Sequence, residues 1–238
     1  MTTEHRWETL YDPAFPYTLR NRLGIGDQAV LNDVEAQLSA LRIAEIAGQD
    51  ATGLFDFGHY CSLHARLLGD VYSWAGAPPP AGGASAGSAR NAIRVLGDDL
   101  SSPSIDYGRL GGRSLRDSAE YIFGYLQAEG CLLGLPPRRF TARLAAYWCA
   151  LSSLPIFPRG NARTETVFFH QLCRHSGRRL DTRKLFAHRV EFRIARSSTE
   201  STRSRYRLFT TLVDAVVDHE ETTEPTRPVV DPLPLGRG

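Results

Sequence analysis

The sequence predicts an all-α fold with one domain, and three observations lead to this. Apolar residues recur every three or four positions along most of the chain, which is the period of a helix with one buried face. Residues that favour helix ends flank these segments, such as Asp27 before the first helix and Gly177 after the fifth. The chain has 238 residues, 42% of them hydrophobic and 23% charged, which suffices for one core of ordinary globular composition.

Seven helices are expected in order along the chain. The first follows Asp27, and its buried face is predicted to hold Val30, Leu31, Val34, Leu38, Leu41 and Ile46. The second is predicted from about Asp56 to Val71, and its buried residues are Phe57, Tyr60, His64, Leu67 and Val71. The others are expected near residues 114–129, 137–152, 162–176, 183–196 and 202–218.

Two segments interrupt the helical pattern. Residues 76–92 consist of Pro, Gly, Ala and Ser with almost nothing to bury, which predicts a flexible loop inside the domain. Residues 220–238 are rich in Pro and Thr and are predicted to be a disordered tail. The domain therefore covers residues 1–219, and the segment near 90–96 is a candidate for a small hairpin.

Charge and hydropathy exclude several classes of protein. The net charge is only +2, so a nucleic-acid partner is not expected. No apolar run is long enough to span a membrane, and the first residues lack the apolar stretch of a signal peptide, which indicates a cytoplasmic protein without a membrane partner. Lys184 is the sole lysine, and the many arginines reflect either anion binding or, as the simpler explanation, a GC-rich genome.

The four cysteines, Cys61, Cys131, Cys149 and Cys173, lie far apart in the sequence. None forms a CxxC pair, so no zinc site and no other metal site is expected. Three of them stand among apolar residues at helical spacing, which predicts buried free thiols at Cys61, Cys149 and Cys173 in a reducing compartment.

Residues 155–166 carry the chemistry that the sequence offers. A Gly160-Asn161 turn opens a helix there, and the first N–H groups of a helix form a site for anions. Arg163 in the first helical turn adds a guanidinium that can bind phosphate with two hydrogen bonds. The same residues also fit a turn with a purely structural role, so the pattern alone leaves both interpretations open.

The chain resembles the Fic family of AMP-transferring proteins, whose loop reads His-Pro-Phe-x-Asp/Glu-Gly-Asn-Gly-Arg-x-x-Arg. Phe157, Gly160, Asn161 and Arg163 stand where that pattern has them, and Ala162 replaces a glycine. The string Gly-Asp-Val-Tyr-Ser-Trp-Ala-Gly at 69–76 is similar to the family's second helix and following turn. Further similar segments are Leu19–Ile25, Leu41-Arg42, Phe55–His64 and Phe168-Phe169. The resemblance implies a Fic-like helical domain with a small β-hairpin flap.

Three positions depart from the family pattern. Pro155 stands at the histidine that takes the proton from the target hydroxyl, and Arg159 stands at the carboxylate that holds Mg²⁺. Thr166 replaces the second arginine, which is expected to contact the outer phosphates of ATP. The resemblance therefore implies an anion cradle made of Arg159, Gly160, Asn161, Ala162 and Arg163, without the residues for conventional AMP transfer.

Other residues could replace the missing base. Glu165 lies one turn into the helix and is expected to face outward, and His170 lies two turns beyond Arg163. His64 falls on the apolar face of the second helix and is interpreted as a core histidine. In the flap, Pro78–Pro80 lack the N–H donors of a strand, although Ile93–Val95 could form one arm.

Three functions remain open. The first is a binding or regulatory protein that holds a phosphate or nucleotide ligand without needing a metal. The second is a divergent Fic-fold enzyme that uses the same cradle on another phosphorylated or acidic substrate. The third is a scaffold that binds a protein partner and no small ligand.

Overall fold

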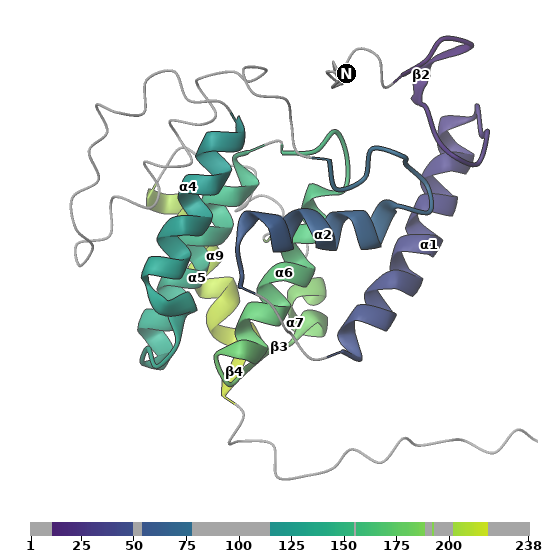
Figure 1. Ribbon diagram of the computed structural model, residues 1–238. Coiled ribbons are helices and arrows are strands. Elements are labelled where there is room, and N and C mark those ends of the chain that lie inside the picture. Colours follow the sequence, from purple (N-terminus) through teal and green to yellow (C-terminus); the bar gives the residue numbers. More distant parts are fainter. Residues whose placement is uncertain are drawn as a thin grey trace, which may run out of the picture.

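The computed structural model describes residues 11–49, 54–77, 115–154, 156–188, 192 and 202–218. These residues are mostly helical, which confirms the all-α prediction (Figure 1). The helices are α1 (Gln28–Ala47), α2 (Phe57–Leu68), α4 (Leu115–Ala128), the short 3₁₀ helix η3 (Gly130–Leu132), α5 (Pro137–Ser152), α6 (Asn161–His175), α7 (Thr182–Ala187) and α9 (Thr202–Ala215). The strands are β1 (Tyr11–Asp12), β2 (Phe15–Leu19), β3 (Arg178–Leu180) and β4 (Val216–Asp218).

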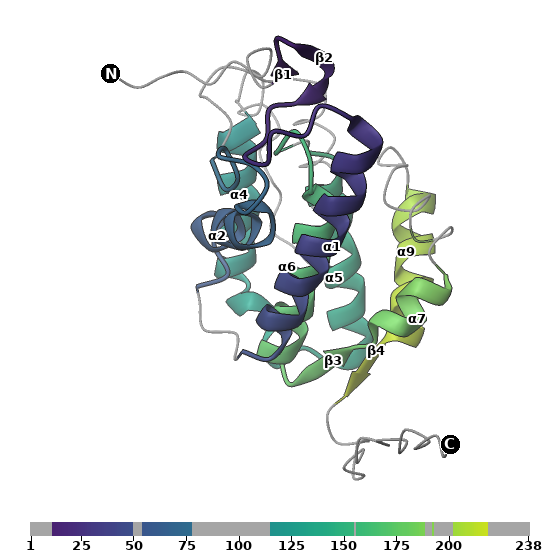
Figure 2. The ribbon, with the colours of Figure 1, turned by 90° about the vertical axis from the view of Figure 1, so that its right-hand side faces the viewer.

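Helix α5 occupies the middle of the described core. It packs against α4, α6 and α9, while α2 crosses α6 and α1 packs on α2 (Figures 1 and 2). Aromatic rings fill the space where α2, α4 and α6 meet: the ring of Tyr60 lies 5.3 Å from Phe123, 5.7 Å from Phe168 and 5.9 Å from Phe157. Phe157 belongs to the loop between α5 and α6, so this aromatic cluster also anchors the loop before α6.

Asp27 and Gly177 flank their helices as predicted, whereas α2 ends at Leu68, three residues before the predicted Val71. The Asp27 carboxylate accepts hydrogen bonds from the N–H groups of Ala29 (2.7 Å) and Val30 (3.0 Å) at the start of α1. Asp56 caps α2 by accepting from the N–H of His59 (2.7 Å). Gly177 follows α6 with a φ of +71°, the left-handed conformation that ends many helices.

The predicted buried face of α1 is partly wrong. Leu31 and Ile46 are buried as expected, but Val30 is 50% exposed and Leu41 is 58% exposed. Two polar residues, Glu35 and Ser39, take the places on the buried face. Helix α1 has apolar residues on two sides. The side that faces the core is the one that carries Glu35, whose carboxylate accepts hydrogen bonds from Tyr72 and Arg163.

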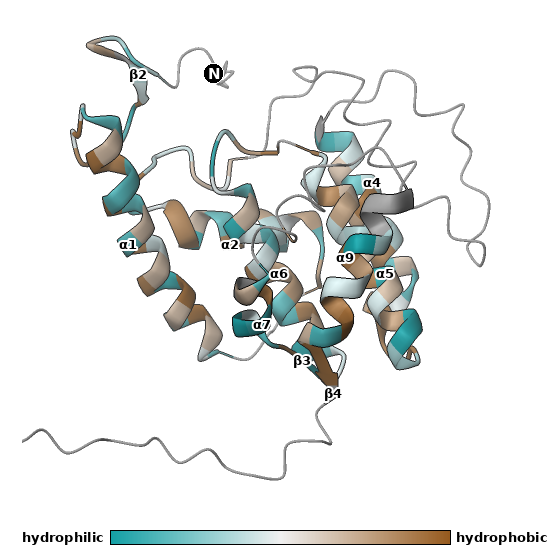
Figure 3. Ribbon diagram, turned by 180° about the vertical axis from the view of Figure 1, so that it is seen from behind, coloured by the Kyte–Doolittle hydropathy of each residue, from teal (hydrophilic) through white to brown (hydrophobic). Residues whose placement is uncertain are grey.

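The predicted helix at 202–218 ends early, because the chain changes to strand β4 at Val216. Strand β4 pairs with β3 in antiparallel register, with Leu180 opposite Val216 and Arg179 opposite Val217. Two consecutive β-branched valines, brown in Figure 3, favour an extended chain over a last helical turn. A second antiparallel pair, β1 with β2, was not expected from the sequence either.

Several predictions concern residues outside the described part of the chain. They are the hairpin near 90–96, the loop 76–92 beyond Ala77, the tail 220–238, and the helix predicted at 183–196 beyond His188 apart from Phe192. Of that last helix, the structure describes α7, which begins one residue earlier than expected.

The four cysteines are free thiols. Cys149 and Cys173 are buried as predicted, whereas Cys61 is only half-buried, because it lies beside a pocket of about 360 Å³ between α2 and α4. Burial nevertheless raises the pKa of the Cys61 thiol to about 12. Within the described ranges, none of the helices has the length and apolar character needed to cross a membrane.

Candidate functional site

The loop before α6 is held in shape by its own residues. The Asn161 side chain donates from Nδ2 to the main-chain oxygen of Phe157 (2.6 Å) and accepts from the N–H of Phe157 through Oδ1 (3.0 Å). Gly160 precedes the helix with a φ of +83°, where a side chain would be strained. Its Cα faces α2 so closely that a Cβ would lie 2.2 Å from Cδ1 of Leu68.

His64 on α2 packs against this loop. It is a core histidine, and both of its ring nitrogens form hydrogen bonds. Its Nε2 lies 2.9 Å from the main-chain oxygen of Arg159, and its Nδ1 lies 2.8 Å from the N–H of Gly76. Because the Gly76 N–H can only donate, Nδ1 accepts and Nε2 carries the hydrogen. Burial lowers the pKa of His64 to about 4, so the ring is neutral at pH 7. The interpretation of His64 as a core residue is confirmed.

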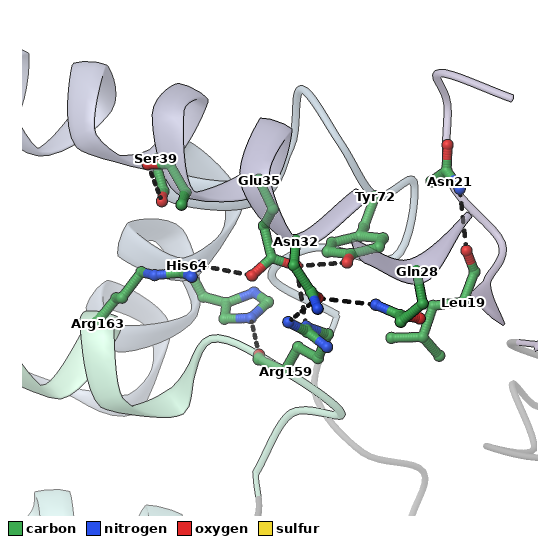
Figure 4. Close-up of polar contacts among 11 residues, drawn as sticks. Leu19, Asn21, Gln28, Asn32, Glu35, Ser39, His64, Tyr72, Arg159 and Arg163 are labelled. Atoms are coloured by element: carbon green, nitrogen blue, oxygen red, sulfur yellow. Dashed lines mark hydrogen bonds and ion pairs between the residues drawn. The ribbon is translucent and has the colours of Figure 1, made fainter. Parts of the chain in front are cut away.

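A buried carboxylate joins the loop to α1. Glu35 on α1 is 1% exposed, and its Oε1 lies 2.6 Å from an amino group of Arg163, while its Oε2 lies 2.9 Å from Nε of Arg159. The hydroxyl of Tyr72 also donates to Oε2. Figure 4 shows Glu35 between Arg163 on one side and Tyr72 on the other. Arg159 also donates from Nη2 to Oδ1 of Asn32 (2.7 Å).

These contacts keep Glu35 ionised. Burial alone would raise its pKa, but the hydrogen bonds from Tyr72 and Arg163 and the positive charges of Arg159 and Arg163 outweigh that effect, and the pKa is lowered. Burial and the hydrogen bond to Glu35 raise the pKa of Tyr72, so Tyr72 stays a neutral donor. The cluster is therefore a carboxylate held by two arginines and one phenol.

The residues predicted as an anion cradle lie together at the start of α6. Gly160 is the N-cap and provides no side chain to the first N–H groups of the helix. Arg159 and Arg163 flank this helix end, and the side chain of each is 32% exposed. The structure thus brings Arg159, Gly160, Asn161, Ala162 and Arg163 to one accessible turn. Pro155 lies outside the described residues.

The two candidate bases lie elsewhere. The expectation that Glu165 faces outward is wrong: it is 1% exposed, because it turns toward α5, where the Ser152 hydroxyl donates to its Oε2 (2.6 Å). His170 is half-buried, and burial followed by the charge of Arg174 lowers its pKa. His170 lies seven residues beyond Arg163, about 10 Å along the helix axis. Neither residue borders the turn.

Sequence reasoning missed Glu35, Tyr72 and Asn32. Glu35 stands 128 residues before Arg163, and no local pattern connects the two. One signal was available: Glu35 and Ser39 follow Leu31, a predicted buried residue, at four-residue spacing, so a helix places all three on one side.

Sequence comparison identifies relatives that match about two thirds of the chain. The chain is 31% identical over 172 residues to the protein adenylyltransferase VbhT of Bartonella schoenbuchensis, a match that covers 70% of this chain and 32% of VbhT. It is 30% identical over 160 residues to the probable protein adenylyltransferase Fic of Salmonella typhimurium, covering 67% of this chain and 69% of that protein. The chain belongs to the Fic family of protein adenylyltransferases.

Solved Fic domains share the fold. BepC of Bartonella tribocorum, crystallised with AMPPNP, superposes with a TM-score of 0.69 at 17% identity, covering 89% of this chain and 97% of BepC. The Fic domain of a putative cell filamentation protein of Bartonella quintana, crystallised with ADP, gives a TM-score of 0.67 at 19% identity, covering 86% of this chain and 93% of that domain. No family model matches the chain. The chain spans about a third of the length of VbhT, the first of the curated relatives.

The residue before Gly160 carries a positive charge. The guanidinium of Arg159 forms an ion pair with the carboxylate of Glu35. Within the described ranges, no group of three or more His, Cys, Asp or Glu residues is arranged to hold a metal ion. Mg²⁺ prefers oxygen ligands, and the Arg159 side chain offers none.

Proposed function

We propose that this Fic-family protein binds a nucleotide or another phosphate-containing ligand at the turn before α6, without a metal ion and without conventional AMP transfer. The observation that carries the proposal is the ion pair between Arg159 and Glu35 (2.9 Å), at the position where the family pattern has an acidic residue for Mg²⁺. A guanidinium there supplies positive charge directly to an anion and repels a divalent cation.

Neither of the two candidate bases, Glu165 and His170, borders this turn in the described part of the chain. Pro155 has no group that can take a proton, while general-base catalysis needs one within hydrogen-bond reach of the attacking hydroxyl. Glu165 is bonded to Ser152, and His170 lies about 10 Å from Arg163 along the helix axis. Proton removal from a target hydroxyl therefore has no agent among these residues.

The groups that would hold the ligand are the N–H groups of the first turn of α6 and the accessible sides of two arginines. Arg163 and Arg159 together can give charge-assisted hydrogen bonds to one phosphoryl group. The Thr166 hydroxyl donates to the main-chain oxygen of Ala162 (2.8 Å), and it replaces an arginine of the family pattern. We therefore expect one phosphoryl group to be bound more firmly than a triphosphate.

Calorimetric titration tests the binding. AMP, ATP and inorganic phosphate are each titrated with EDTA and with Mg²⁺, and the adenine nucleotides are chosen because BepC and the Bartonella quintana domain were crystallised with AMPPNP and ADP. We expect binding in EDTA, weakened about tenfold to a hundredfold by Arg163→Ala, since a hydrogen bond to a charged group contributes about 1.5–3 kcal/mol. The matched control is Arg183→Ala, on the exposed surface of α7. Affinities weaker than millimolar, or an unchanged affinity in Arg163→Ala, would contradict the proposal.

Incubation with labelled ATP and candidate target proteins tests the absence of AMP transfer. We expect no incorporated label with Mg²⁺, and none after Pro155→His alone, because Arg159 still disfavours the metal. Labelling that depends on Asn161 would show that another base exists and that the protein is a divergent transferase.

A further inference from the structure

The cluster around Glu35 has a defined charge. Arg159 and Arg163 contribute two positive charges, and the ionised Glu35 contributes one negative charge. Its other polar members are neutral: Tyr72 donates its hydroxyl hydrogen to Glu35, and Asn32 accepts from Arg159. His64, which packs beneath the loop, is neutral because its Nδ1 accepts from the N–H of Gly76. The site offers a ligand one net positive charge.

The Glu35 carboxylate is buried, whereas the two arginine side chains are partly exposed to solvent. Glu35 is 1% exposed, whereas the arginine side chains are each 32% exposed. Arg163 donates one N–H to Glu35, and Arg159 forms an ion pair with Glu35 and donates one N–H to Asn32. Each guanidinium carries five N–H groups, so each has further N–H groups beyond those used in these contacts. An anion that arrives from solvent can contact both guanidinium groups while Glu35 stays in place behind them.

We propose that Glu35 is a specificity-determining residue, which offsets one of the two arginine charges and so lets the cradle accept a singly charged phosphodiester nearly as well as a doubly charged phosphomonoester. This inference rests on the proposed function, because it concerns the ligand of the same turn. The predicted ligands are therefore phosphodiesters as well as phosphomonoesters.

The physical basis is the dependence of a Coulomb interaction on the ligand's charge. A unit charge about 4 Å from another changes an affinity by about fivefold even at the dielectric constant of water. Replacing Glu35 by a neutral residue removes repulsion in proportion to ligand charge, so a dianion gains about twenty-five-fold and a monoanion about fivefold. The ratio of the two affinities is therefore the quantity that reports the role of Glu35.

The test compares AMP with its 5′-phosphate methyl ester by calorimetry in EDTA at pH 7.5, where a phosphomonoester with a second pKa of about 6 is mostly doubly charged. In the unmodified protein we expect the two affinities to agree within about fivefold. In Glu35→Gln the ratio of AMP affinity to ester affinity should rise about fivefold. Glu35→Asp, which keeps the charge, should restore the original ratio.

Two further variants keep the test decisive. Arg159→Gln removes one positive charge from a half-exposed position, so the ratio of AMP affinity to ester affinity should fall about fivefold. This variant can be measured if Glu35→Gln does not fold. Glu45→Gln removes the same charge as Glu35→Gln from the same helix, but Glu45 is exposed and bonded to Arg42, so the ratio should not change.

The outcomes separate the two proposals. If AMP binds but the ratio is the same in Glu35→Gln, Arg159→Gln and the unmodified protein, Glu35 does not select ligand charge and this inference is wrong, while the proposed function stands. Equal strengthening of both ligands in Glu35→Gln would mean that Glu35 merely occupies the site, and would also overturn the inference. If neither AMP nor its ester binds, both proposals fall.

Discussion

His64 donates from Nε2 to the main-chain oxygen of Arg159 over 2.9 Å, and this bond fastens the loop before α6 to helix α2. The imidazole also stacks on Phe157 of the same loop, with ring centroids 3.6 Å apart. The N–H of Gly76 donates to Nδ1 (2.8 Å), and this third contact is lost when Nδ1 takes up a proton. The stability of the loop is therefore coupled to the protonation of one buried histidine.

We expect the free energy of unfolding to depend on pH through His64. Its pKa is lowered from 6.5 to about 4 by burial, so the unfolded chain takes up the proton first as the pH falls. The stabilisation is complete above pH 6.5 and is lost as the pH falls toward 4, by up to about 3 kcal/mol. Urea unfolding at pH 7 and at pH 4.5 measures this. His64→Gln should reduce the pH dependence of the free energy of unfolding, whereas His188→Gln, at an exposed histidine, should not. The same pH dependence in the unmodified protein and both variants would show that His64 is not its source.

Glu35→Ala should destabilise the fold strongly. The substitution leaves the guanidinium groups of Arg159 and Arg163 without their carboxylate, and breaking a buried ion pair from one side costs about 3–5 kcal/mol. Both arginines are half-exposed and recover some hydration, so we expect the lower end of that range. Thermal and urea unfolding give the value. Glu45→Ala on the same helix removes an exposed pair with Arg42 and should cost less than about 1 kcal/mol; similar losses in both variants would refute the special role of Glu35.

Gly160→Ala tests the close approach of the turn to α2. Alanine would be strained at a φ of +83°, and its Cβ would lie 2.2 Å from Cδ1 of the buried Leu68. Strain of about 1 kcal/mol and overpacking of about 1–3 kcal/mol should add. Gly177→Ala is the matched control, because it has a φ of +71° but nothing within 4 Å of the added Cβ. If both variants lose the same stability in urea unfolding, the contact with Leu68 contributes nothing.

Much of the helical fold could be predicted from local sequence signals. Helix α5 was expected at 137–152 and has those bounds, because its apolar period is continuous and it lies between two Pro- or Gly-containing turns. Asp27 and Gly177 act through hydrogen bonds and backbone conformations that reach only a few residues. Such signals are present in the sequence itself.

The errors have a different origin. Val30 and Leu41 were expected to be buried because they are apolar, yet the orientation of α1 depends on which side meets Arg159, Arg163 and Tyr72. These partners come from distant parts of the chain. For the same reason Glu165 was placed outside, although Ser152 provides a hydrogen bond inside. The start of α6 after Gly160 could be predicted from the sequence, but not the carboxylate of Glu35 that pairs with Arg159 and Arg163.

Asn161→Ala should weaken both the loop and the ligand site. Its amide bonds to the N–H of Phe157 (3.0 Å) and to the oxygen of Phe157 (2.6 Å), so alanine leaves two main-chain groups without these partners. At about 1 kcal/mol for each hydrogen bond, the loss of unfolding free energy should be about 2 kcal/mol.

Because this loop carries Arg159 toward Glu35, the affinity for AMP should fall together with the stability of the Asn161→Ala variant. Asn32→Ala is the matched control, since it removes an amide that only accepts from Arg159 and from Gln28 near the surface, and it should cost less than about 1 kcal/mol. Urea unfolding and calorimetric titration of AMP on both variants give the two quantities. A stable Asn161→Ala protein with reduced AMP binding would instead mean that the amide contacts the ligand directly. Unchanged stability and unchanged AMP affinity would mean that the amide does not hold the loop in place.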